Sequence, residues 1–492
     1  MSGITSRTLK IFAIKGTAAL MLAGCATVPG SELAAGAPIS PAERQQGAEA
    51  DPQLIAEFGG EMTGPHADYV RSVGNKIAAQ SGLGSAGEFD VALLNTPVNN
   101  AFAIPGGYVY VTRQLVSLMN NEAELAGVLG HEVGHVAARH SARRQQVAQR
   151  NSLLGVLGQV LAGAVLGNSE LGQLGQQIAS SAPQLATLSY SRSQELEADQ
   201  LGIEYLNSAG YDPRAMATVL ASLAAQNSLD ASLMGSATTV PAWASTHPDP
   251  ASRVQTALQR AGNGTGATNR DVFLSRIDGL MYGDDPQQGV VEGRQFIHPV
   301  YRFEFTAPQG FYLLNGTQAV SINGNSGKGQ LSTAAYNGNM DGYIRGIFQK
   351  IGGTQQTLAP QSIQRTTVNG LDAAFGTARV ASGGNQVDVT VFAYQFANNQ
   401  AFHFATITPA GQANVFNPMF TSMRRITQAE ADRVIPRRVQ VVTVQRGDTV
   451  QSLANRMAYS TAQVERFRVL NGLGSSDTLT PGQKVKLVVR GR

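Results

Sequence analysis

Two histidines four residues apart, with a glutamate directly after the first, constrain this chain more than any other feature. They are His131 and His135, and the glutamate is Glu132. Apolar residues recur at helical spacing around the pair, at Leu125, Val128, Leu129 and Val136. Asn121 and Glu124 have the form of a capping box, so we expect a helix that begins near Asn121 and buries one face.

On such a helix, residues four apart lie about 40° from one another, so both imidazoles can reach one cation from adjacent turns. Glu132 projects beside them, where a carboxylate can take the proton of a water molecule that a zinc ion has acidified. A zinc site of this kind needs a third protein ligand. The fold must therefore bring a residue from elsewhere in the chain to this helix.

The candidates for the third ligand are His140 and the segment around Glu195. On a continuing helix, His140 lies about 180° from His131 and points away from the metal, so we expect a surface histidine there. Glu195 and Asp199 are again four residues apart, on a second predicted helix. If Glu195 binds the metal, Asp199 lies one turn away and can accept the second N–H of a ligand histidine. Glu197 faces away from Glu195 and is expected to be a solvated charge.

Further motifs around the histidine pair resemble a known family. The pair is followed by Ser191 to Asp199 and by Thr246 to Pro250, and it is preceded by Asn100 to Gly107. In this order, over about Pro52 to Ala261, the motifs are similar to the metalloproteases that include the CAAX prenyl endopeptidases, the HtpX heat-shock proteases and the periplasmic BepA-type proteases. The resemblance implies a zinc endopeptidase in which Glu195 is the third ligand, and it includes the aspartate that corresponds to Asp199.

The resemblance also implies that His247 lies close to the metal. Its expected role is either the fourth ligand at rest or a stabiliser of the oxyanion, with Arg253 as a second donor. The stretch Asn100 to Gly107 borders the cleft in this family. We expect the strand at Tyr108 to Val111 to be an open edge, along which an extended substrate forms main-chain hydrogen bonds.

The N-terminus has the pattern of a bacterial lipoprotein. Three basic residues precede an apolar stretch, Gly16 to Leu22, that is too short for a stable membrane span. The Leu-Ala-Gly-Cys string that ends at Cys25, the only cysteine, resembles a lipobox. We therefore expect residues 1–24 to be a signal peptide, Cys25 to be acylated and residues 25–52 to be a flexible tether. Ala26 favours the periplasmic side of the outer membrane over the inner membrane.

The rest of the chain divides into several predicted regions. Residues 53–262, mostly helical with one hairpin-like stretch, are assigned to a mainly α protease domain, which the resemblance makes zincin-like (gluzincin). A connector, residues 263–295, precedes an α+β domain with an antiparallel sheet over residues 296–426, and a charged linker follows at 427–440. The apolar run Leu153 to Leu166 is too short to span a bilayer, so we expect a helix packed in the protein or over the cleft, with a membrane-touching flap as the alternative.

Residues 441–488 resemble a LysM module. The matching strings are Val442 to Thr449, Ser452 to Ala454, Leu470 to Leu473 and Leu479 to Val485. That family has a βααβ fold and binds glycans that contain N-acetylglucosamine, such as peptidoglycan. Arg456 to Tyr459 replaces the family's usual short turn, which leaves open whether the module binds glycan or docks onto the protease.

Together these features predict a zinc-dependent endopeptidase of the bacterial cell envelope, with one Zn²⁺ per chain, that hydrolyses misfolded or misassembled periplasmic and outer-membrane proteins. The alternatives are a peptidoglycan peptidase and a non-enzymatic chaperone or scaffold. The intact Glu132 argues against a scaffold, which has no need of a general base. A net charge of +3 without a basic stripe argues against nucleic acid as a partner.

Overall fold

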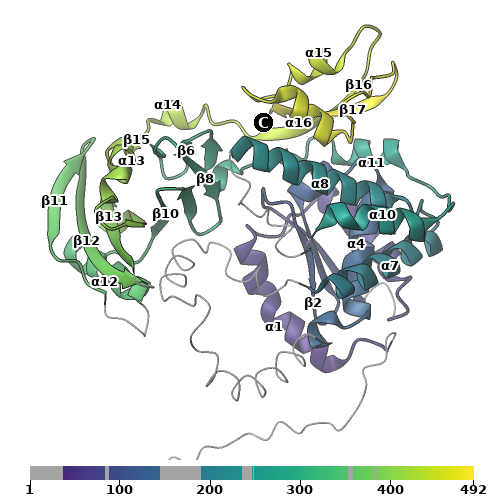
Figure 1. Ribbon diagram of the computed structural model, residues 1–492, viewed down its shortest axis with the longest axis horizontal. Helices are drawn as coiled ribbons and strands as arrows, with labels where there is room; N and C mark the ends of the chain where they lie inside the picture. Colours follow the sequence, from purple (N-terminus) through teal and green to yellow (C-terminus); the bar gives the residue numbers. More distant parts are fainter. Residues whose placement is uncertain are drawn as a thin grey trace, which may run out of the picture. The chain divides into compact units, whose positions relative to one another are not determined.

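The computed structural model describes residues 37–83, 88–143, 190–234, 247, 249–352, 358–382 and 385–491 (Figure 1). The predicted signal peptide, Cys25 and the apolar run from Leu153 to Leu166 lie outside the described residues. Within the described part of the chain, none of the helices combines the length and the apolar content needed to cross a bilayer. The chain carries a first domain of helices around a small sheet, then a mixed helix and sheet region, and then a C-terminal module.

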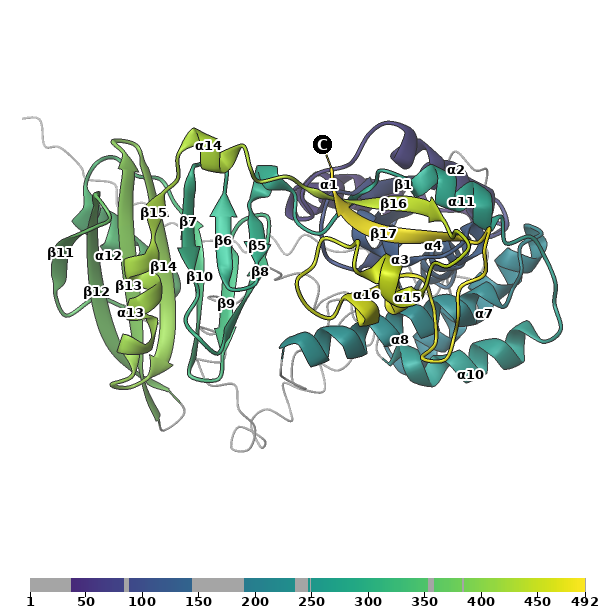
Figure 2. The same ribbon diagram turned by 90° about the horizontal axis from the view of Figure 1, so that it is seen from above.

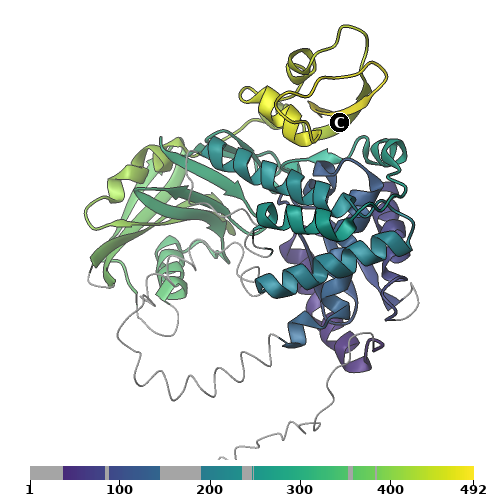
Figure 3. The ribbon, with the colours of Figure 1, turned by 45° about the vertical axis from the view of Figure 1, so that its right-hand side comes forward.

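The helices of the first domain gather against a three-stranded sheet (Figure 3, purple to teal). Its elements are α1 (Pro41–Glu57), α2 (Pro65–Ala78), β1 (Asp90–Leu94), β2 (Ala101–Ile104), β3 (Tyr108–Thr112), α3 (Arg113–Leu118), α4 (Glu122–Ala137), α7 (Arg192–Ser208), α8 (Ala215–Met234), α10 (Pro250–Ala261) and α11 (Arg270–Ile277). The strand order is β1-β3-β2, with β1 parallel and β2 antiparallel to β3.

The open edge of this sheet lies on a different strand from the one predicted. Tyr108 to Val111 belong to β3, which pairs with β1 on one side and with β2 on the other, so the expectation of an open edge there is wrong. The reason is β1, a strand absent from the sequence prediction, whose Asp90 pairs with Tyr108. The edge strand that packs beside α4 is β2.

The predicted tether is also corrected, because much of it is helix α1. Ser40 caps the helix and forms a capping box with Glu43. The Tyr110 hydroxyl donates to Asp51 at 2.7 Å, which ties the helix to the sheet. At Gly47 a Cβ would overlap the Pro105 carbonyl and the Tyr108 ring, so the helix packs directly on the turn between β2 and β3.

Helices α4 and α7 cross at glycines, which lets their backbones approach closely. A Cβ at Gly134 would lie 3.2 Å from the Ala198 carbonyl oxygen, and one at Gly202 would lie 3.1 Å from the backbone nitrogen of His131. Nearly every residue of α4 is buried. The predicted cap of α4 is present in part: the Asn121 side chain accepts from the Glu124 N–H, but the Glu124 carboxylate accepts from the N–H of Asn120 instead of Asn121.

The mixed region contains a seven-stranded antiparallel sheet in the order β11-β12-β13-β14-β10-β9-β8, which can be followed in Figure 2, and a four-stranded sheet in the order β15-β7-β6-β5. One face of the larger sheet packs on α12 and the other on an aromatic cluster. The elements are β4 (Met281–Tyr282), η3 (Pro286–Gln288), β5 (Val290–Glu292), β6 (Gln295–His298), β7 (Phe303–Thr306), β8 (Phe311–Asn315), β9 (Val320–Gly324), β10 (Gly327–Thr333), α12 (Met340–Gly352), β11 (Ile363–Val368), β12 (Leu371–Ser382), β13 (Asn385–Ala397), β14 (Gln400–Pro409), η4 (Ala413–Phe416), α13 (Asn417–Ser422), β15 (Arg424–Arg425) and α14 (Gln428–Ala431).

The C-terminal module has the order β16 (Arg437–Thr443), α15 (Val450–Ala454), α16 (Gln463–Leu470) and β17 (Lys484–Arg490). Its sheet gains a third strand, β4, from the residues that were predicted to be a connector. That connector also holds α11, whose Phe273 and Ile277 are buried in the core of the first domain together with Val439 of β16. The predicted bounds of the connector (263–295) and of the linker (427–440) are therefore corrected, because apolar side chains of both segments are buried in the core of the first domain.

Candidate metal centre

Helix α4 presents His131, Glu132 and His135 from one buried surface. All three side chains are at most 2 % exposed. The Nε2 atoms of the two histidines lie 3.0 Å apart, and their rings meet edge to face. The two imidazoles therefore point at a common position, as their four-residue spacing predicts.

Helix α7 brings Glu195 to the same position. Ser191 caps this helix and forms a capping box with Gln194, so Glu195 stands in the first turn. Its carboxylate oxygens lie 3.6 Å from His131 Nε2 and 3.4 Å from His135 Nε2. Asp199, one turn further on, lies 2.9 Å from His131 Nδ1.

His247 completes the cluster from the loop before α10. Its Nδ1 lies 3.1 Å from Glu195 Oε1 and 3.4 Å from His131 Nε2. Its Nε2 lies 3.1 Å from the carbonyl oxygen of Ala101 on β2 and 3.5 Å from Glu132 Oε1. One atom from each of His131, His135, Glu195 and His247 lies within 4.8 Å of the others, and all four residues are buried.

The outer partners of the histidines assign their protons, because carboxylates and carbonyls only accept. Asp199 assigns the Nδ1 proton to His131, and Ala101 assigns the Nε2 proton to His247. His140 lies with Nδ1 2.7 Å from His135 Nδ1 and with Nε2 3.1 Å from Glu197, so His135 donates to His140 and His140 donates to Glu197. The Nε2 atoms of His131 and His135 then turn their lone pairs to the centre of the cluster. The Nδ1 of His247 faces the Glu195 carboxylate at 3.1 and 3.2 Å. Burial alone would lower the pKa of His247, but the carboxylates of Glu195 and Glu132 outweigh it and raise the pKa.

This donor set fits a divalent metal. Ligand atoms at about 2.0–2.1 Å from a tetrahedral ion lie about 3.3 Å from one another, and the distances among the two Nε2 atoms and the Glu195 oxygens run from 3.0 to 3.6 Å. Lone pairs that face one another at such distances repel unless a cation lies between them. Both oxygens of Glu132 are also buried without a hydrogen-bond partner among the described residues, so the site holds a free acceptor beside that cation position.

The charge states of His135, Glu195 and Glu132 agree with metal binding. Burial lowers the pKa of His135 well below its usual value, so the ring is neutral and its lone pair is available. Burial alone would raise the pKa of Glu195, but the neighbouring His247 and His135 outweigh it and hold the pKa well below its usual range. Burial raises the pKa of Glu132, which makes this carboxylate a better base than an exposed one.

Arg253, on α10, is buried and binds the two carboxylates of α7. Its Nη1 donates to Glu195 at 2.5 Å, and its Nη2 and Nε donate to Asp199 at 2.5 and 2.8 Å. The guanidinium is thus directed at the carboxylates that face the histidines. The predicted role of Arg253 as a second donor to the oxyanion stays a prediction.

The expectation that His140 lies on the surface is wrong, because its side chain is fully buried. Glu197 is 43 % exposed, as expected of a solvated charge, and it accepts from His140 and from Arg143. Helix α4 ends at Ala137, and Arg139 has a left-handed backbone with φ of 50°, so the helical angle between His131 and His140 does not apply.

Tyr190 is a site residue that sequence reasoning missed. Its ring stacks on His135, with centroids 3.8 Å apart and planes 16° from parallel. The only signal in the sequence is an aromatic residue directly before the cap of α7. Such a residue is equally typical of a helix boundary without a site.

Comparison with known proteins gives two family matches. Residues 66–261 match Peptidase family M48, and residues 442–488 match the LysM domain. The chain is 34 % identical over 224 residues to a beta-barrel assembly-enhancing protease of Yersinia pestis, which covers 44 % of each protein. It is 33 % identical over 196 residues to the protein of that name from Escherichia coli strain K12, covering 39 % of this chain and 38 % of the relative.

The similarity extends to a eukaryotic protein. The chain is 32 % identical over 217 residues to mitochondrial metalloendopeptidase OMA1 of Schizosaccharomyces pombe, covering 43 % of this chain and 59 % of the relative. The chain spans less than half the length of the two bacterial relatives it matches. The similarity is therefore that of a shared protease domain.

Proposed function

Residues 66–261 are a peptidase family M48 domain, and from that premise we propose that the chain is a zinc-dependent endopeptidase of the bacterial cell envelope. The observation that carries the proposal is the convergence of His131, His135, Glu195 and His247 on one position. The buried carboxylate of Glu132, which has no hydrogen-bond partner among the described residues, lies beside it. A structural cluster would have no use for such a carboxylate, whereas hydrolysis needs a base there.

His131, His135 and Glu195 would hold the ion, since two imidazoles and a carboxylate are a donor set that suits zinc. When bound, zinc supplies Lewis acidity, which polarises the scissile carbonyl and makes a water molecule more acidic. His247 would be the fourth ligand at rest, since its Nδ1 faces Glu195 and the Nε2 of His131 while its other nitrogen donates to Ala101. Asp199 orients His131, and Arg253 holds Asp199 and Glu195 in place.

Glu132 acts as the general base. It accepts a proton from the water that attacks the peptide carbonyl, and it passes that proton to the amine nitrogen as the C–N bond breaks. The substrate lies extended along β2, the edge strand that reaches the cluster through Ala101. Main-chain pairing along such an edge is independent of sequence, which suits a protease of unfolded chains.

The cellular setting is inferred from the sequence and from the relatives. The lipobox-like string at Cys25 anchors the protein to the outer membrane on its periplasmic side. The LysM domain, residues 442–488, contacts peptidoglycan. The bacterial relatives are named for enhancing beta-barrel assembly, so the substrates are misfolded or misassembled envelope proteins, and the role is protein quality control.

The test compares the metal-loaded chain with its Glu132→Gln variant on an unfolded protein. We expect both proteins to retain one zinc per chain and the variant to lose about 10²–10⁴-fold in cleavage rate. Equal cleavage by the two proteins would contradict the proposal. Loss of cleavage together with loss of zinc would instead place Glu132 among the groups that hold the metal.

The LysM domain supports a second candidate function, a peptidoglycan peptidase. The same pair of proteins, incubated with isolated peptidoglycan, distinguishes the two. Release of muropeptides that depends on Glu132, without cleavage of the unfolded protein, would favour the second function. Absence of both activities would leave a chaperone or scaffold.

The anchor has its own test. Cys25→Ala should move the protein from the membrane fraction to the soluble fraction. Continued association of the variant with membranes would contradict acylation of Cys25.

A further inference from the structure

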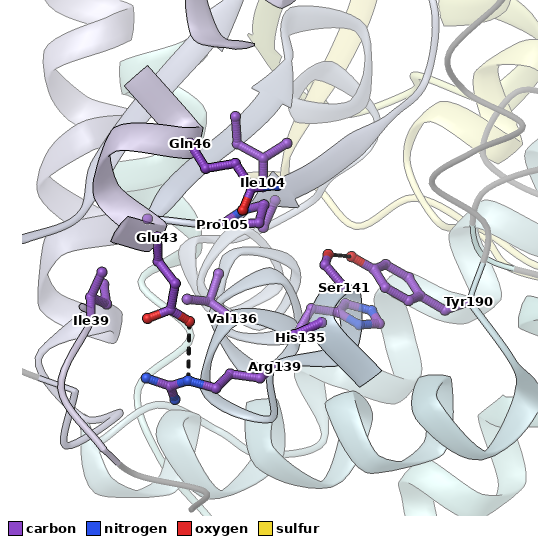
Figure 4. Close-up of a pocket in the computed structure, with 13 residues that line it drawn as sticks. Ile39, Glu43, Gln46, Ile104, Pro105, His135, Val136, Arg139, Ser141 and Tyr190 are labelled. Atoms are coloured by element: carbon purple, nitrogen blue, oxygen red, sulfur yellow. Dashed lines mark hydrogen bonds and ion pairs between the residues drawn. The ribbon is translucent and has the colours of Figure 1, made fainter. Parts of the chain in front are cut away.

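A cavity adjoins the metal centre at the far end of strand β2 (Figure 4). His135 lines it on the side of the metal, and Ile104 lines it at the end of the strand. Ile104 lies three residue steps along β2 from Ala101, beside His247, which is about 10 Å at the usual rise of a strand. A chain extended along β2 would therefore place its second or third residue from the scissile bond at this cavity.

Most of the cavity wall is apolar and firmly held. Ile39, Ile104 and Val136 provide the apolar surface. Helix α1 forms the outer wall, where Arg44 Nη1 donates to the Gly106 carbonyl at 2.6 Å. Because α1 also packs on the turn after β2 without room for a side chain at Gly47, this wall is rigid.

Arg139 lines the cavity and has hydrogen-bonding capacity that the described residues do not use. Arg139 is only 6 % exposed, and its Nη2 donates to the carbonyls of Ala37 and Pro38 at 2.8 and 3.0 Å. Its Nη1 is buried without a hydrogen-bond partner among the described residues. A buried donor of this kind favours a ligand that brings an acceptor.

The charge of Arg139 is already balanced. Glu43 Oε1 lies 3.1 Å from Arg139 Nε, and Figure 4 shows the two side chains facing each other. The other Glu43 oxygen accepts from the Ser40 N–H and hydroxyl, both at 2.8 Å. A second carboxylate in the cavity would therefore be repelled by Glu43, whereas a neutral acceptor would not be.

We propose that this cavity is a specificity subsite for a substrate side chain with an apolar stem and a neutral hydrogen-bond acceptor at its end, the chemistry of glutamine. The stem packs on Ile104 and Val136, and the amide oxygen accepts from Arg139 Nη1. Glu43 sets the preference for the neutral side chain over glutamate. The inference rests on the proposed endopeptidase function and refines it.

The test uses the zinc-loaded full chain and a peptide set that places glutamine, glutamate, methionine or alanine at each of three positions on either side of one cleavable bond. We expect one position, two or three residues from the bond, at which kcat/KM for glutamine exceeds that for methionine about 10-fold or more. Arg139→Met should reduce this ratio to about 1. Arg71→Met, which removes a half-exposed arginine of α2 that pairs with Glu61 and Asp68, is the matched control and should leave the ratio unchanged.

A second variant covers the case in which Arg139→Met fails to fold. Glu43→Gln keeps the capping acceptor for Ser40 and removes the negative charge. It should shift the preference from glutamine towards glutamate by about 10-fold, which a purely structural role of Glu43 would not do.

Peptide binding to the Glu132→Gln chain separates the subsite from hydrolysis. The dissociation constants should follow the same order of side chains even if no peptide is cleaved. Cleavage without any such preference, or a preference that survives both variants, would overturn the subsite and leave the protease intact. Ordered binding without Glu132-dependent cleavage would overturn the proposed function and leave the subsite.

Discussion

Lys486 of the C-terminal module reaches into the first domain, and its removal should destabilise the whole protein. Its Nζ donates to the carbonyls of Ser117, Leu118 and Met119, at the end of α3, at 2.8, 3.1 and 2.5 Å. Burial lowers the pKa of Lys486, but three acceptors use all three N–H bonds of the ammonium form. The nearby Glu124, at the start of helix α4, adds a favourable charge interaction.

The size of the effect follows from these contacts. Three charge-assisted hydrogen bonds contribute about 1.5–3 kcal/mol each, and desolvation of the ammonium group offsets several kcal/mol of that sum. We therefore expect Lys486→Met to lower the free energy of unfolding by about 3 kcal/mol. At about 2–4 °C per kcal/mol, the midpoint of thermal unfolding should fall by about 6–12 °C.

The assay is urea and thermal unfolding of the full chain, followed by circular dichroism. Lys484→Met is the matched control, because Lys484 belongs to the same strand and pairs with the exposed Asp271 at 3.4 Å. It should cost less than about 1 kcal/mol. The double variant with Glu124→Gln should be less destabilised than the sum of the single changes by about 1 kcal/mol. A loss for Lys486→Met no larger than that of Lys484→Met would refute the reasoning.

Three further predictions follow from other contacts. Asp199→Asn should weaken metal affinity about 10–100-fold, as measured by competition with a chelator, because His131 loses its acidic partner. Asp212→Asn is the control and should leave the affinity unchanged, since Asp212 pairs only with the half-exposed Arg214. Equal metal affinities of the two variants would show that His131 needs no acidic partner. Gly47→Ala should destabilise the protein by about 1–3 kcal/mol, because α1 must move off the turn between β2 and β3. Gly346→Ala is the control and should stabilise the protein by up to about 1 kcal/mol, because its new Cβ meets no atom within 4 Å. A lower midpoint of thermal unfolding for Gly346→Ala than for Gly47→Ala would contradict this packing. Burial lowers the pKa of His298 to about 4 and that of His403 to about 3. Between about pH 6.5 and pH 4 the unfolded chain therefore binds more protons than the folded chain, so the free energy of unfolding falls as the pH falls. The two groups together account for about 2.7 kcal/mol per pH unit. Urea midpoints at pH 7 and pH 5 measure that loss, and a stability that is independent of pH over this range would rule it out.

Local pattern was sufficient for the elements that carry the candidate metal ligands. The sequence predicts a helix from Asn121 with two histidines on adjacent turns, and α4 has this form. The four-residue spacing of Glu195 and Asp199 likewise predicts their common helix, α7. These inferences succeed because helical periodicity and capping act over a few residues.

The predictions were wrong where a contact joins segments that are distant in the chain, or where the backbone leaves a regular helix. His140 would point away from His131 only on a continuing helix, but α4 ends at Ala137 and the backbone of Arg139 is left-handed. Strand β1 took the side of β3 that was expected to be open, a pairing that only long-range hydrogen bonds establish. The segment predicted to be a tether forms α1, which lines the cavity beside β2. It packs on the turn at Pro105 because Gly47 leaves no side chain in between.

The sequence by itself determined which residue types can hold a metal and activate water, since ligand chemistry and helical spacing are local properties. Only the tertiary structure decided which nitrogen of each histidine faces the centre, because Asp199, Ala101 and Glu197 come from other elements and take up the remaining protons. It likewise decided that the C-terminal module is joined to the protease domain, because the acceptors of the buried ammonium group of Lys486 lie more than 360 residues earlier in the chain. A buried charge is stabilised by partners that can come from anywhere in the chain, and the local sequence pattern does not identify those partners.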